Sequence, residues 1–248
     1  MRKEKFIVNH YYHIYNRGSR KAEIVRDTAD KWRFMQALRF FNDSHSSAHI
    51  LRQAGFLSLS LSAPGADRHR EAESVFDLGW PPNWPDRDPL VKILCYSLIP
   101  NHFHLLLKEI SESGISKFMH KLGMGYANFF NLKYHEVGSI FQGPYKAKLI
   151  KEETYLKYLT AYIQVINVLE LYPGGFERAL ENFSEAMEFL NKYSFSSHPD
   201  YAGLRSSLIV DKDILGEFFP NADAYRKFVL ETIVSRDFNK ILGDLTLE

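Results

Sequence analysis

The chain has 248 residues, 45% of them hydrophobic, which is ample for a substantial core in one enlarged domain or two small ones. Its 31 Lys and Arg balance 30 Asp and Glu to a net charge of +1, so overall charge indicates no nucleic-acid partner and any basic surface must be local. The single cysteine, Cys95, excludes a disulfide framework and a thiolate metal cage, and the lack of a signal-type or membrane-length apolar segment predicts a soluble, cytoplasmic protein.

The first half of the chain contains a strand, a helix and an insertion. FIVNHYYHIYNRG (6–18) mixes β-branched and aromatic residues and ends in a glycine, which predicts a strand that runs into a turn. A helix is expected to start at Asp27 or Thr28, either of which can cap it, and to continue to about Asn42. Residues 44–90 are rich in Ser, Ala, Gly, Asp and Arg, and they predict a long insertion.

The second half returns to regular elements. VKILCYSLI (91–99) and HFHLLLKEI (102–110) are apolar runs separated by Pro-Asn, which predicts an antiparallel hairpin of core strands. A helix is expected from residue 113 to about residue 134. It is followed by a strand in YKAKLIK (145–151) and by an amphipathic helix that begins near Glu152.

The order of these elements is strand, helix, strand, strand, helix, strand, helix. It predicts an α+β fold of the ferredoxin-like or RRM-like split β-α-β type, an antiparallel sheet with helices on one face. A Pro-Gly-Gly break at 173–175 opens a further helical segment. We therefore expect a domain over residues 1–172, interrupted by the insertion at about 44–90, and a separate helical C-terminal extension over residues 173–248.

Two histidines interrupt the second strand of the hairpin. Because side chains alternate along a strand, His102 and His104 project to one face while Phe103 enters the other. Two imidazoles so placed can ligate one cation. By itself, so short a pattern more often belongs to histidines that hydrogen-bond at a sheet surface.

Tyrosine is the other abundant group that can do chemistry. The chain has no Cys-His set, GxSxG turn, GxxxxGKS loop or cysteine pair, but it has 14 tyrosines. Tyr155, Tyr158 and Tyr162 share one stripe of the last amphipathic helix. We expect Tyr155 and Tyr158 to pack on the sheet, while at least one of the three can point at the histidine face.

Five segments form an ordered series. They are YYHIYNRGSRK (11–21), LCYSLIPNHFHLLLK (94–108), MGYANFFNLKYHEVGSIFQGPYKAKLI (124–150), YLKYLTAYIQVIN (155–167) and YSFSSHPDYAG (193–203). Together they resemble the single-tyrosine transposases of the His-hydrophobic-His (HUH) superfamily, in particular the REP-associated tyrosine transposases. The resemblance spans roughly residues 6–203 apart from the insertion. Its specificity lies in the series NRG, PNHFH, FNxxxxxxGxxFQGxY and a late-helix Tyr-Ile.

The resemblance implies a compact sheet-and-helix nuclease domain. Such a domain binds single-stranded DNA, often beside a hairpin, and cuts and rejoins it through a covalent phosphotyrosine. His102 and His104 match the metal-binding pair of the family, and Tyr162 matches its nucleophile.

The chain departs from the family after this tyrosine. The family has a polar residue, commonly the Asn of an Asn-Pro pair, four positions later as a third metal ligand. Here Ile166 occupies that position and Asn167-Val168 follows. Asn167 can serve if the helix is locally distorted. Gln164 and water are alternatives, and so is a loss of activity.

Phosphodiester cleavage explains why such groups are needed. A cation held by two imidazoles polarises the phosphate and stabilises the negative charge that develops on its oxygens. Imidazole suits Mn²⁺, and Mg²⁺ prefers oxygen ligands with several waters, so the expected cofactor is Mg²⁺ or Mn²⁺. A phenol with a pKa near ~10 is a poor nucleophile and needs help from a base, the cation or solvent.

Basic and aromatic residues provide candidates for DNA contact, although solvated charge and core packing are the ordinary roles of these residue types. The basic candidates are Arg17, Arg20, Lys21, Lys146, Lys148 and Lys151. The aromatic candidates are Tyr11, Tyr12, Phe141 and Tyr145. His10 and His13 flank the first strand and can approach the site, but we expect hydrogen-bonded structural roles for them.

The resemblance therefore implies a metal-dependent single-stranded DNA endonuclease and strand transferase, with single-stranded or hairpin DNA as its partner and no membrane. Two alternatives remain open: a nucleic-acid-binding protein of the same fold without catalysis, and a metal-dependent phosphodiester hydrolase that uses activated water. The sequence leaves open whether the protein is a monomer or a homodimer.

Overall fold

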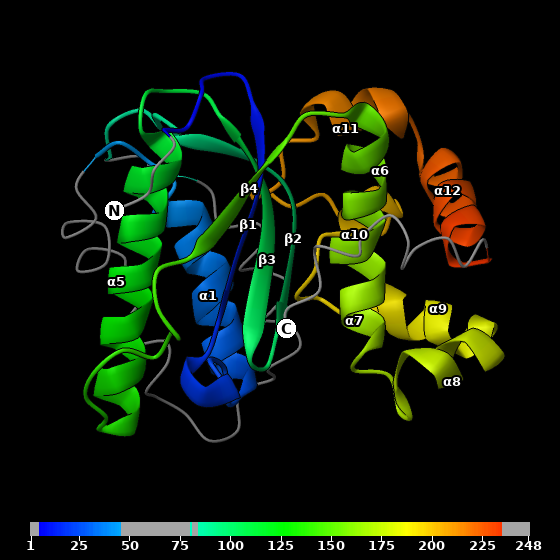
Figure 1. Cartoon of the computed structure of the whole chain (residues 1–248), viewed down its shortest axis with the longest axis horizontal. Coiled ribbons are helices and arrows are strands. Elements are labelled where there is room, and N and C mark those ends of the chain that lie inside the picture. The colour runs from blue at the N-terminus through cyan, green and yellow to red at the C-terminus, as the bar shows by residue number, and fades with distance from the viewer. Residues whose placement is uncertain (1–4, 46–79, 81–83, 235–248) are drawn as a thin grey trace.

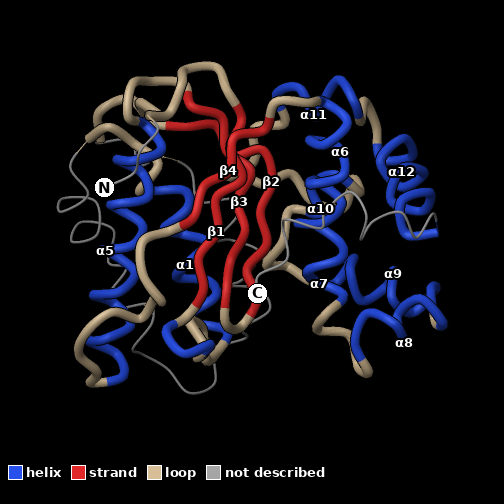
Figure 2. Tube along the Cα trace, in the orientation of Figure 1, coloured by secondary structure: helices blue, strands red, loops and turns tan. Residues whose placement is uncertain are grey.

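The computed structural model describes residues 5–45, 80 and 84–234, so most of the predicted insertion lies outside the described residues. In this part of the chain, four antiparallel strands form one sheet in the order β2-β3-β1-β4 (Figures 1 and 2). The strands are β1 (Tyr11–Arg17), β2 (Val91–Ile99), β3 (His102–Glu109) and β4 (Lys146–Ile150). The first strand starts later than expected because Asn9, with a φ of 64°, breaks the extended backbone.

Two helices, α1 (Thr28–Phe40) and α5 (Gly114–Tyr134), cover one face of the sheet (Figure 1). Asp27 caps α1, as predicted, because its carboxylate accepts the N–H of Asp30 at 2.8 Å. The buried carboxylate of Glu109 accepts the first N–H groups of α5. The core between these helices and the sheet includes Ile14, Phe34, Phe103, Leu105, Phe118 and Tyr126, all buried.

The opposite face carries the remaining helices (Figures 1 and 2). They are α6 (Glu153–Ala161), η2 (Tyr162–Ile166), α7 (Asn167–Leu169), α8 (Gly175–Glu181), α9 (Phe183–Lys192), α10 (His198–Tyr201), α11 (Asp213–Phe218) and α12 (Ala222–Val234). Leu94, Cys95 and Leu106 leave an apolar area on this face, and they join one buried cluster with residues from α6 to α12. The expected fold class is confirmed, but the helices lie on both faces of the sheet rather than on one, because this second apolar area also has to be buried. Cys95 is a buried free thiol, as expected.

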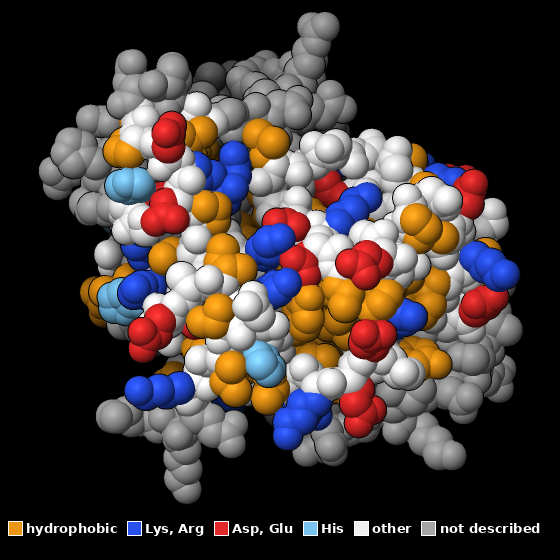
Figure 3. Space-filling view, turned by 90° about the horizontal axis from the view of Figure 1, so that it is seen from above, with side chains coloured by type: hydrophobic (Ala, Val, Ile, Leu, Met, Phe, Trp, Pro, Cys, Tyr) orange, Lys and Arg blue, Asp and Glu red, His pale blue; other side chains and the backbone are white. Residues whose placement is uncertain are grey.

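Helix α11 is joined to the end of the sheet where β1 begins. Asp213 of α11 accepts a hydrogen bond from the hydroxyl of Tyr11 at 2.7 Å and pairs with Lys92 and Lys108 at 2.9 and 3.1 Å. Figure 3 views the molecule from this end, and basic and acidic side chains are intermixed there around a hydrophobic area. This end therefore has no single sign of charge among its described residues, in keeping with the near-zero net charge. Among the helices of the described ranges, none combines the length and apolar character needed to cross a membrane.

Candidate active site

The polar side chains of the predicted site lie on one face of the sheet, as the register of the strands shows. Residues directly opposite each other on antiparallel strands project to the same face. Tyr15 lies opposite His104 of β3 and opposite Lys146 of β4. Arg17 lies opposite His102. Tyr11, Lys92 and Lys108 lie on this face at the end where β1 begins. The polar residues of the face around the two histidines are His13, Tyr15, Arg17, Ser97, His102, His104, Lys146 and Lys148.

Both ring nitrogens of His102 form hydrogen bonds. Nδ1 lies 2.7 Å from Oδ1 of Asn101, which only accepts hydrogen bonds, so Nδ1 carries the proton. Nε2 lies 3.0 Å from Nδ2 of Asn167 and accepts from it. Burial, and secondly Arg17, lower the pKa of His102 to about 4, so the imidazole is neutral at pH 7. The lone pair of a neutral imidazole nitrogen therefore faces Asn167.

His104 is fully buried, and its partner is a histidine of β1. Its Nδ1 lies 2.8 Å from Nε2 of His13, whose ring is also fully buried. No described residue hydrogen-bonds to Nε2 of His104 or to Nδ1 of His13. Burial lowers the pKa of His13 to about 3, and burial and the neighbouring histidines hold the pKa of His104 well below its ordinary value. Both rings are therefore neutral at pH 7, and His104 keeps one nitrogen for a ligand.

Tyr162 lies against this histidine pair. Its ring meets that of His104 edge-on, with centroids 5.4 Å apart and an interplanar angle of 88°, and its centroid is 6.5 Å from that of His13. Burial raises the pKa of Tyr162 to about 12, Glu170 adds to the rise, and a hydrogen bond with Asn167 opposes it. The phenol and the imidazoles thus meet within a single chain.

A π turn brings Asn167 to the same side as this phenol. In η2 the backbone N–H of Asn167 donates to the carbonyl oxygen of Tyr162, a bond that spans five residues instead of four. An α-helix turns about 100° per residue, so in a regular helix Asn167 would point about 140° away from Tyr162. The π turn takes up the extra residue. The local distortion that Asn167 needs in order to approach the histidines is therefore present, and its role as a metal ligand stays a prediction.

The side chain of Asn167 is buried with partners on both of its polar atoms. Its Oδ1 accepts a hydrogen bond from the hydroxyl of Ser97 at 3.1 Å, while its Nδ2 faces His102. A half turn of the amide would exchange oxygen and nitrogen, and the Ser97 hydroxyl would then accept instead of donate. Ser97 therefore supports either orientation, including the one that turns the amide oxygen toward the histidines.

The stretch YSFSSHPDYAG (193–203) lies along the edge of β2. Ser196 forms a β-bridge with Ser97, and the backbone N–H of Ser197 donates to the carbonyl of Tyr96. The hydroxyl of Ser197 accepts a hydrogen bond from Nε2 of Gln164 at 2.9 Å. The stretch thus covers the edge of β2, and Ser197 holds the π turn through its hydrogen bond with Gln164. Gln164, an alternative third ligand in the sequence, is directed to Ser197 instead of the histidines.

The basic candidates lie at and beyond this face. Arg17 lies beside His102, and its buried Nε has no hydrogen-bond partner among the described residues. Lys146 is exposed and Lys148 is half-buried on the same face. Arg20 and Lys21 are exposed in the short turn η1 (Ser19–Lys21), which follows β1. Lys151 is exposed directly after β4. Three of the six basic candidates therefore share the histidine face, and Arg20, Lys21 and Lys151 lie beyond the ends of its strands.

The aromatic candidates lie elsewhere. Tyr12 and Phe141 are buried in the core beneath α1 and α5, and Tyr145 packs against that core. Tyr11 donates its hydroxyl to Asp213 at the far end of the sheet. The half-buried aromatic ring beside the histidines is instead Tyr15, whose centroid is 5.6 Å from that of His104.

Two members of this face, Tyr15 and Ser97, were missed from the sequence, and His13 was expected to have a structural role although it can approach the site. His13 and Tyr15 alternate along β1 with Arg17, and this alternation was a signal that they share a face. The signal could not tell which strand β1 would pair with. Ser97 gave no signal, because a serine in an apolar strand is common.

The donors of the histidine face suit a weakly held divalent cation. Among the described residues, no group of three or more His, Cys, Asp and Glu is arranged to hold a metal. The available donors are the imidazole nitrogens of His102 and His104 and the amide of Asn167. Such a mixed nitrogen and oxygen set fits Mn²⁺ or Mg²⁺ with waters completing the coordination. The observation that favours this fit is the buried Nε2 of His104, which has no partner in the described chain.

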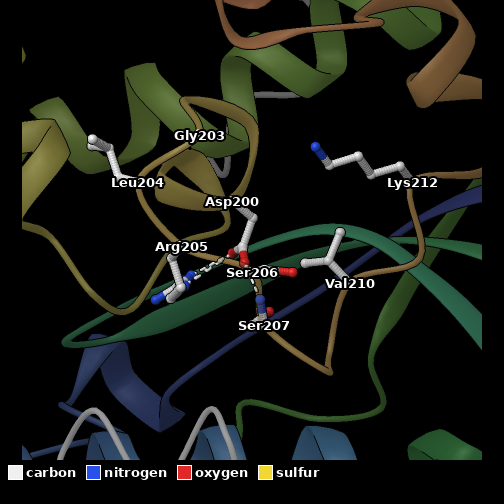
Figure 4. A pocket seen from close by; sticks show the side chains of 8 residues that line it. All are labelled: Asp200, Gly203, Leu204, Arg205, Ser206, Ser207, Val210 and Lys212. Carbon is white, nitrogen blue, oxygen red and sulfur yellow. Dashed lines mark hydrogen bonds and ion pairs between the residues drawn. The ribbon is translucent and has the colours of Figure 1, made fainter.

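A cavity of about 520 Å³ lies outside this face, in the segment that follows α10 (Figure 4). Asp200 and Arg205 form an ion pair in its wall, and the backbone N–H of Ser207 donates to Asp200 at 2.7 Å (Figure 4). The guanidinium of Arg205 also donates to the carbonyl oxygens of Ser194 and Ser196. These groups hold the chain together after α10, and none of the predicted site residues lines the cavity.

The fold and site together define a class: an antiparallel sheet with a His-hydrophobic-His pair that faces a tyrosine from a following helix. Residues 87–165 match the family model described as "Transposase IS200 like". The segment includes β2, β3, β4 and Tyr162, while Asn167 and the C-terminal helices lie beyond it.

One similar solved structure is that of a REP-associated tyrosine transposase bound to a REP hairpin. It is 12% identical to this chain, with a TM-score of 0.42, and the match covers 85% of this chain and 93% of that one. No curated protein matches the chain.

Proposed function

We propose that this chain is a metal-dependent transposase that nicks and rejoins single-stranded DNA near hairpins through Tyr162. The observation that carries the proposal is the convergence in one chain of the Tyr162 phenol with His104 and Asn167. The family match of residues 87–165 supports the same class of activity.

The chemistry assigned to Tyr162 is a transesterification. Its phenolic oxygen attacks the phosphorus, the new O–P bond forms, the P–O3′ bond breaks, and the 3′ oxygen leaves and takes up a proton. The phosphate stays on the protein as a 5′-phosphotyrosine, and a 3′ hydroxyl can reverse the step and join strands. Because the pKa of Tyr162 is raised to about 12, its proton has to be removed during the attack, and the negative charge on the phosphate has to be stabilised.

His102, His104 and Asn167 are the residues that would hold a divalent cation. When bound, the cation supplies positive charge to the phosphate oxygens. Neutral imidazoles are needed for this role, and burial keeps the pKa of His102 at about 4 and that of His104 well below its ordinary value.

In this proposal the contacts with DNA phosphates are confined to the histidine face. Arg17, Lys146 and Lys148 place positive charge on the histidine face, whereas charges are mixed at the end of the molecule seen in Figure 3. Phosphate contacts of this kind bind without reading sequence, and they lose affinity as salt is added.

Non-catalytic nucleic-acid binding is the second candidate, and the burial of the site favours it. His104 is 0% exposed and Tyr162 is 6% exposed, so little of either side chain is accessible to a phosphate. The third candidate, hydrolysis by an activated water, has no need of Tyr162.

One experiment separates these candidates. Hairpin DNA with a single-stranded flank, labelled at its 3′ end, is incubated with the full chain and Mn²⁺ or Mg²⁺, and the products are resolved after denaturation. We expect a labelled protein adduct that Tyr162→Phe abolishes. Tyr158→Phe is the matched control, because Tyr158 lies one turn earlier and packs on the apolar cluster. Cleavage that survives Tyr162→Phe supports the hydrolase, and binding without cleavage supports the non-catalytic protein.

A further inference from the structure

The hydrogen bond between His13 and His104 is the polar contact of this face that the proposed chemistry does not use. His13 Nε2 and His104 Nδ1 are 2.8 Å apart, and the two rings lie within 17° of parallel with centroids 5.0 Å apart. Both side chains are fully buried. A hydrogen bond between two neutral imidazoles needs one nitrogen with a proton and one without, so the proton positions of the two rings are tied to each other.

The strand pairing holds the contact in place. His13 lies opposite Leu106, two residues from His104 on β3, so the two histidines are diagonal neighbours on one face of paired strands. The ring of Tyr15, which is directly opposite His104, lies 4.8 Å from that of His13 on the same face. The two imidazoles therefore meet between strands of the central sheet, where the backbone is fixed by hydrogen bonds on both sides of β1.

Another buried histidine shows what a purely structural role looks like in this chain. His198 is fully buried, and both of its nitrogens have partners, the hydroxyl of Tyr225 at 3.0 Å and Oδ1 of Asn191 at 3.1 Å. In the pair of His13 and His104, each ring has one nitrogen without a described partner. Buried polar groups normally find partners, so an unpaired nitrogen beside a tyrosine indicates a place for a ligand.

We propose that His13 is a positioning residue, which holds the His104 ring through the bond to Nδ1 so that His104 Nε2 presents its lone pair to a divalent cation. The inference rests on the proposed function. In this arrangement His104 Nδ1–H donates to His13 Nε2, and His13 keeps its own proton on Nδ1. Residues that bond to the second nitrogen of a metal-binding histidine fix its tautomer and ring orientation in this way, and their removal typically weakens metal binding by about 10- to 100-fold.

The test compares four variants of the full chain. His13→Phe keeps a buried ring but loses the hydrogen bond, while His13→Gln keeps a polar group near the place of Nε2. His104→Ala removes the ligand itself, and His198→Phe is the matched control because it changes a buried histidine outside the site. Mn²⁺ affinity is measured by the loss of the free-ion EPR signal, on samples whose folding is checked by circular dichroism. The ring tautomers of the metal-free protein are read from long-range ¹H–¹⁵N correlation spectra.

We expect His13→Phe to bind Mn²⁺ about 10- to 100-fold more weakly than the wild type, His13→Gln to recover most of the affinity, and His198→Phe to leave it unchanged. We also expect the His104 ring nitrogen shifts of the metal-free protein to change in His13→Phe. If His13→Phe does not fold, His13→Asn replaces it, because its shorter amide does not reach the place of Nε2.

The outcomes separate the two proposals. If the wild type binds Mn²⁺, His104→Ala does not, and folded His13→Phe binds like the wild type with unchanged His104 shifts, the positioning role is overturned and the metal site stands. If the wild type and His104→Ala bind equally weakly, the metal site of the proposed function fails, and the positioning role fails with it.

Discussion

The side-chain nitrogen of Asn167 lies 3.0 Å from Nε2 of His102, although 65 positions separate the two residues. The contact exists because the π turn over Tyr162–Ile166 rotates Asn167 back toward the sheet. The resemblance implies a polar residue at position 166, where this chain has Ile166. The wider π turn accommodates Ile166 as one extra residue, so Tyr162 and Asn167 still lie on one side of the helix.

The first prediction concerns this extra residue. Deletion of Ile166 is expected to convert the π turn to an α-helical turn and to place the asparagine four residues after Tyr162. Because Ile166 is only half-buried while Ile163 and Val165 are fully buried, the core loses little. Mn²⁺ affinity and the midpoint of thermal unfolding should both stay close to those of the wild type.

Two variants serve as controls for the deletion. Asn167→Ala should lose Mn²⁺ affinity and destabilise the fold by about 1–3 kcal/mol, since it leaves buried partners of the amide unpaired. Ile166→Asn, which restores a polar residue at the fourth position without removing the extra one, should not rescue Asn167→Ala. A folded deletion variant without Mn²⁺ affinity would contradict the role assigned to the π turn.

The second prediction concerns how the site is assembled. Tyr162 and His104 meet within one chain, so two inactive variants should not complement each other. A mixture of Tyr162→Phe and His104→Ala is expected to form no DNA adduct at any ratio, whereas each variant mixed with the wild type leaves the wild-type signal. Adduct formation by the mixture would mean that the nucleophile acts in the site of a second copy.

The third prediction concerns the dependence of stability on pH. Burial, then Arg226 and Arg205, lower the pKa of His198 to about 4 in the folded protein. The unfolded chain, with an ordinary value near ~6.5, binds more protons between these limits, so stability is full above pH ~6.5 and is lost as the pH falls toward 4. His13 shifts in the same direction and adds to the loss.

Urea unfolding at several pH values checks this. The free energy of unfolding should fall by roughly 1 kcal/mol per pH unit for each such histidine. His198→Gln, which keeps polar atoms in the site but does not titrate, should show a shallower slope than the wild type between pH 6 and 4. Equal slopes would show that His198 is not held neutral by burial.

The fourth prediction uses two glycines of α5 that differ in their surroundings. A Cβ on Gly125 would overlap the ring of Phe41, while a Cβ on Gly123 would meet no atom within 4 Å. Gly125→Ala should therefore destabilise the protein by about 1–3 kcal/mol through overpacking. Gly123→Ala should stabilise it by up to about 1 kcal/mol, because alanine is the better helix former. Urea unfolding at pH 7.5 measures both, and an equal effect of the two changes would contradict the close packing of α5 on α1.

Local sequence determined much of this protein. The apolar runs around Pro100-Asn101 predicted the hairpin of β2 and β3, and strand alternation predicted that His102 and His104 share a face. Asp27 predicted the start of α1. These features follow from interactions within a few residues, namely the alternation of side chains along a strand and the capping of a helix end, so they can be predicted from short stretches of the chain.

Tertiary structure decided the rest. The pairing of β1 with β3 brings His13 to His104 across 91 positions, and the π turn brings Asn167 to His102. Leu94, Cys95 and Leu106 turned the second face of the sheet into a surface that the C-terminal helices cover. Each of these contacts depends on which strand lies beside which and on how a helix meets the sheet. Those choices minimise exposed apolar surface and unpaired polar groups over the whole chain, and no short stretch of sequence contains them.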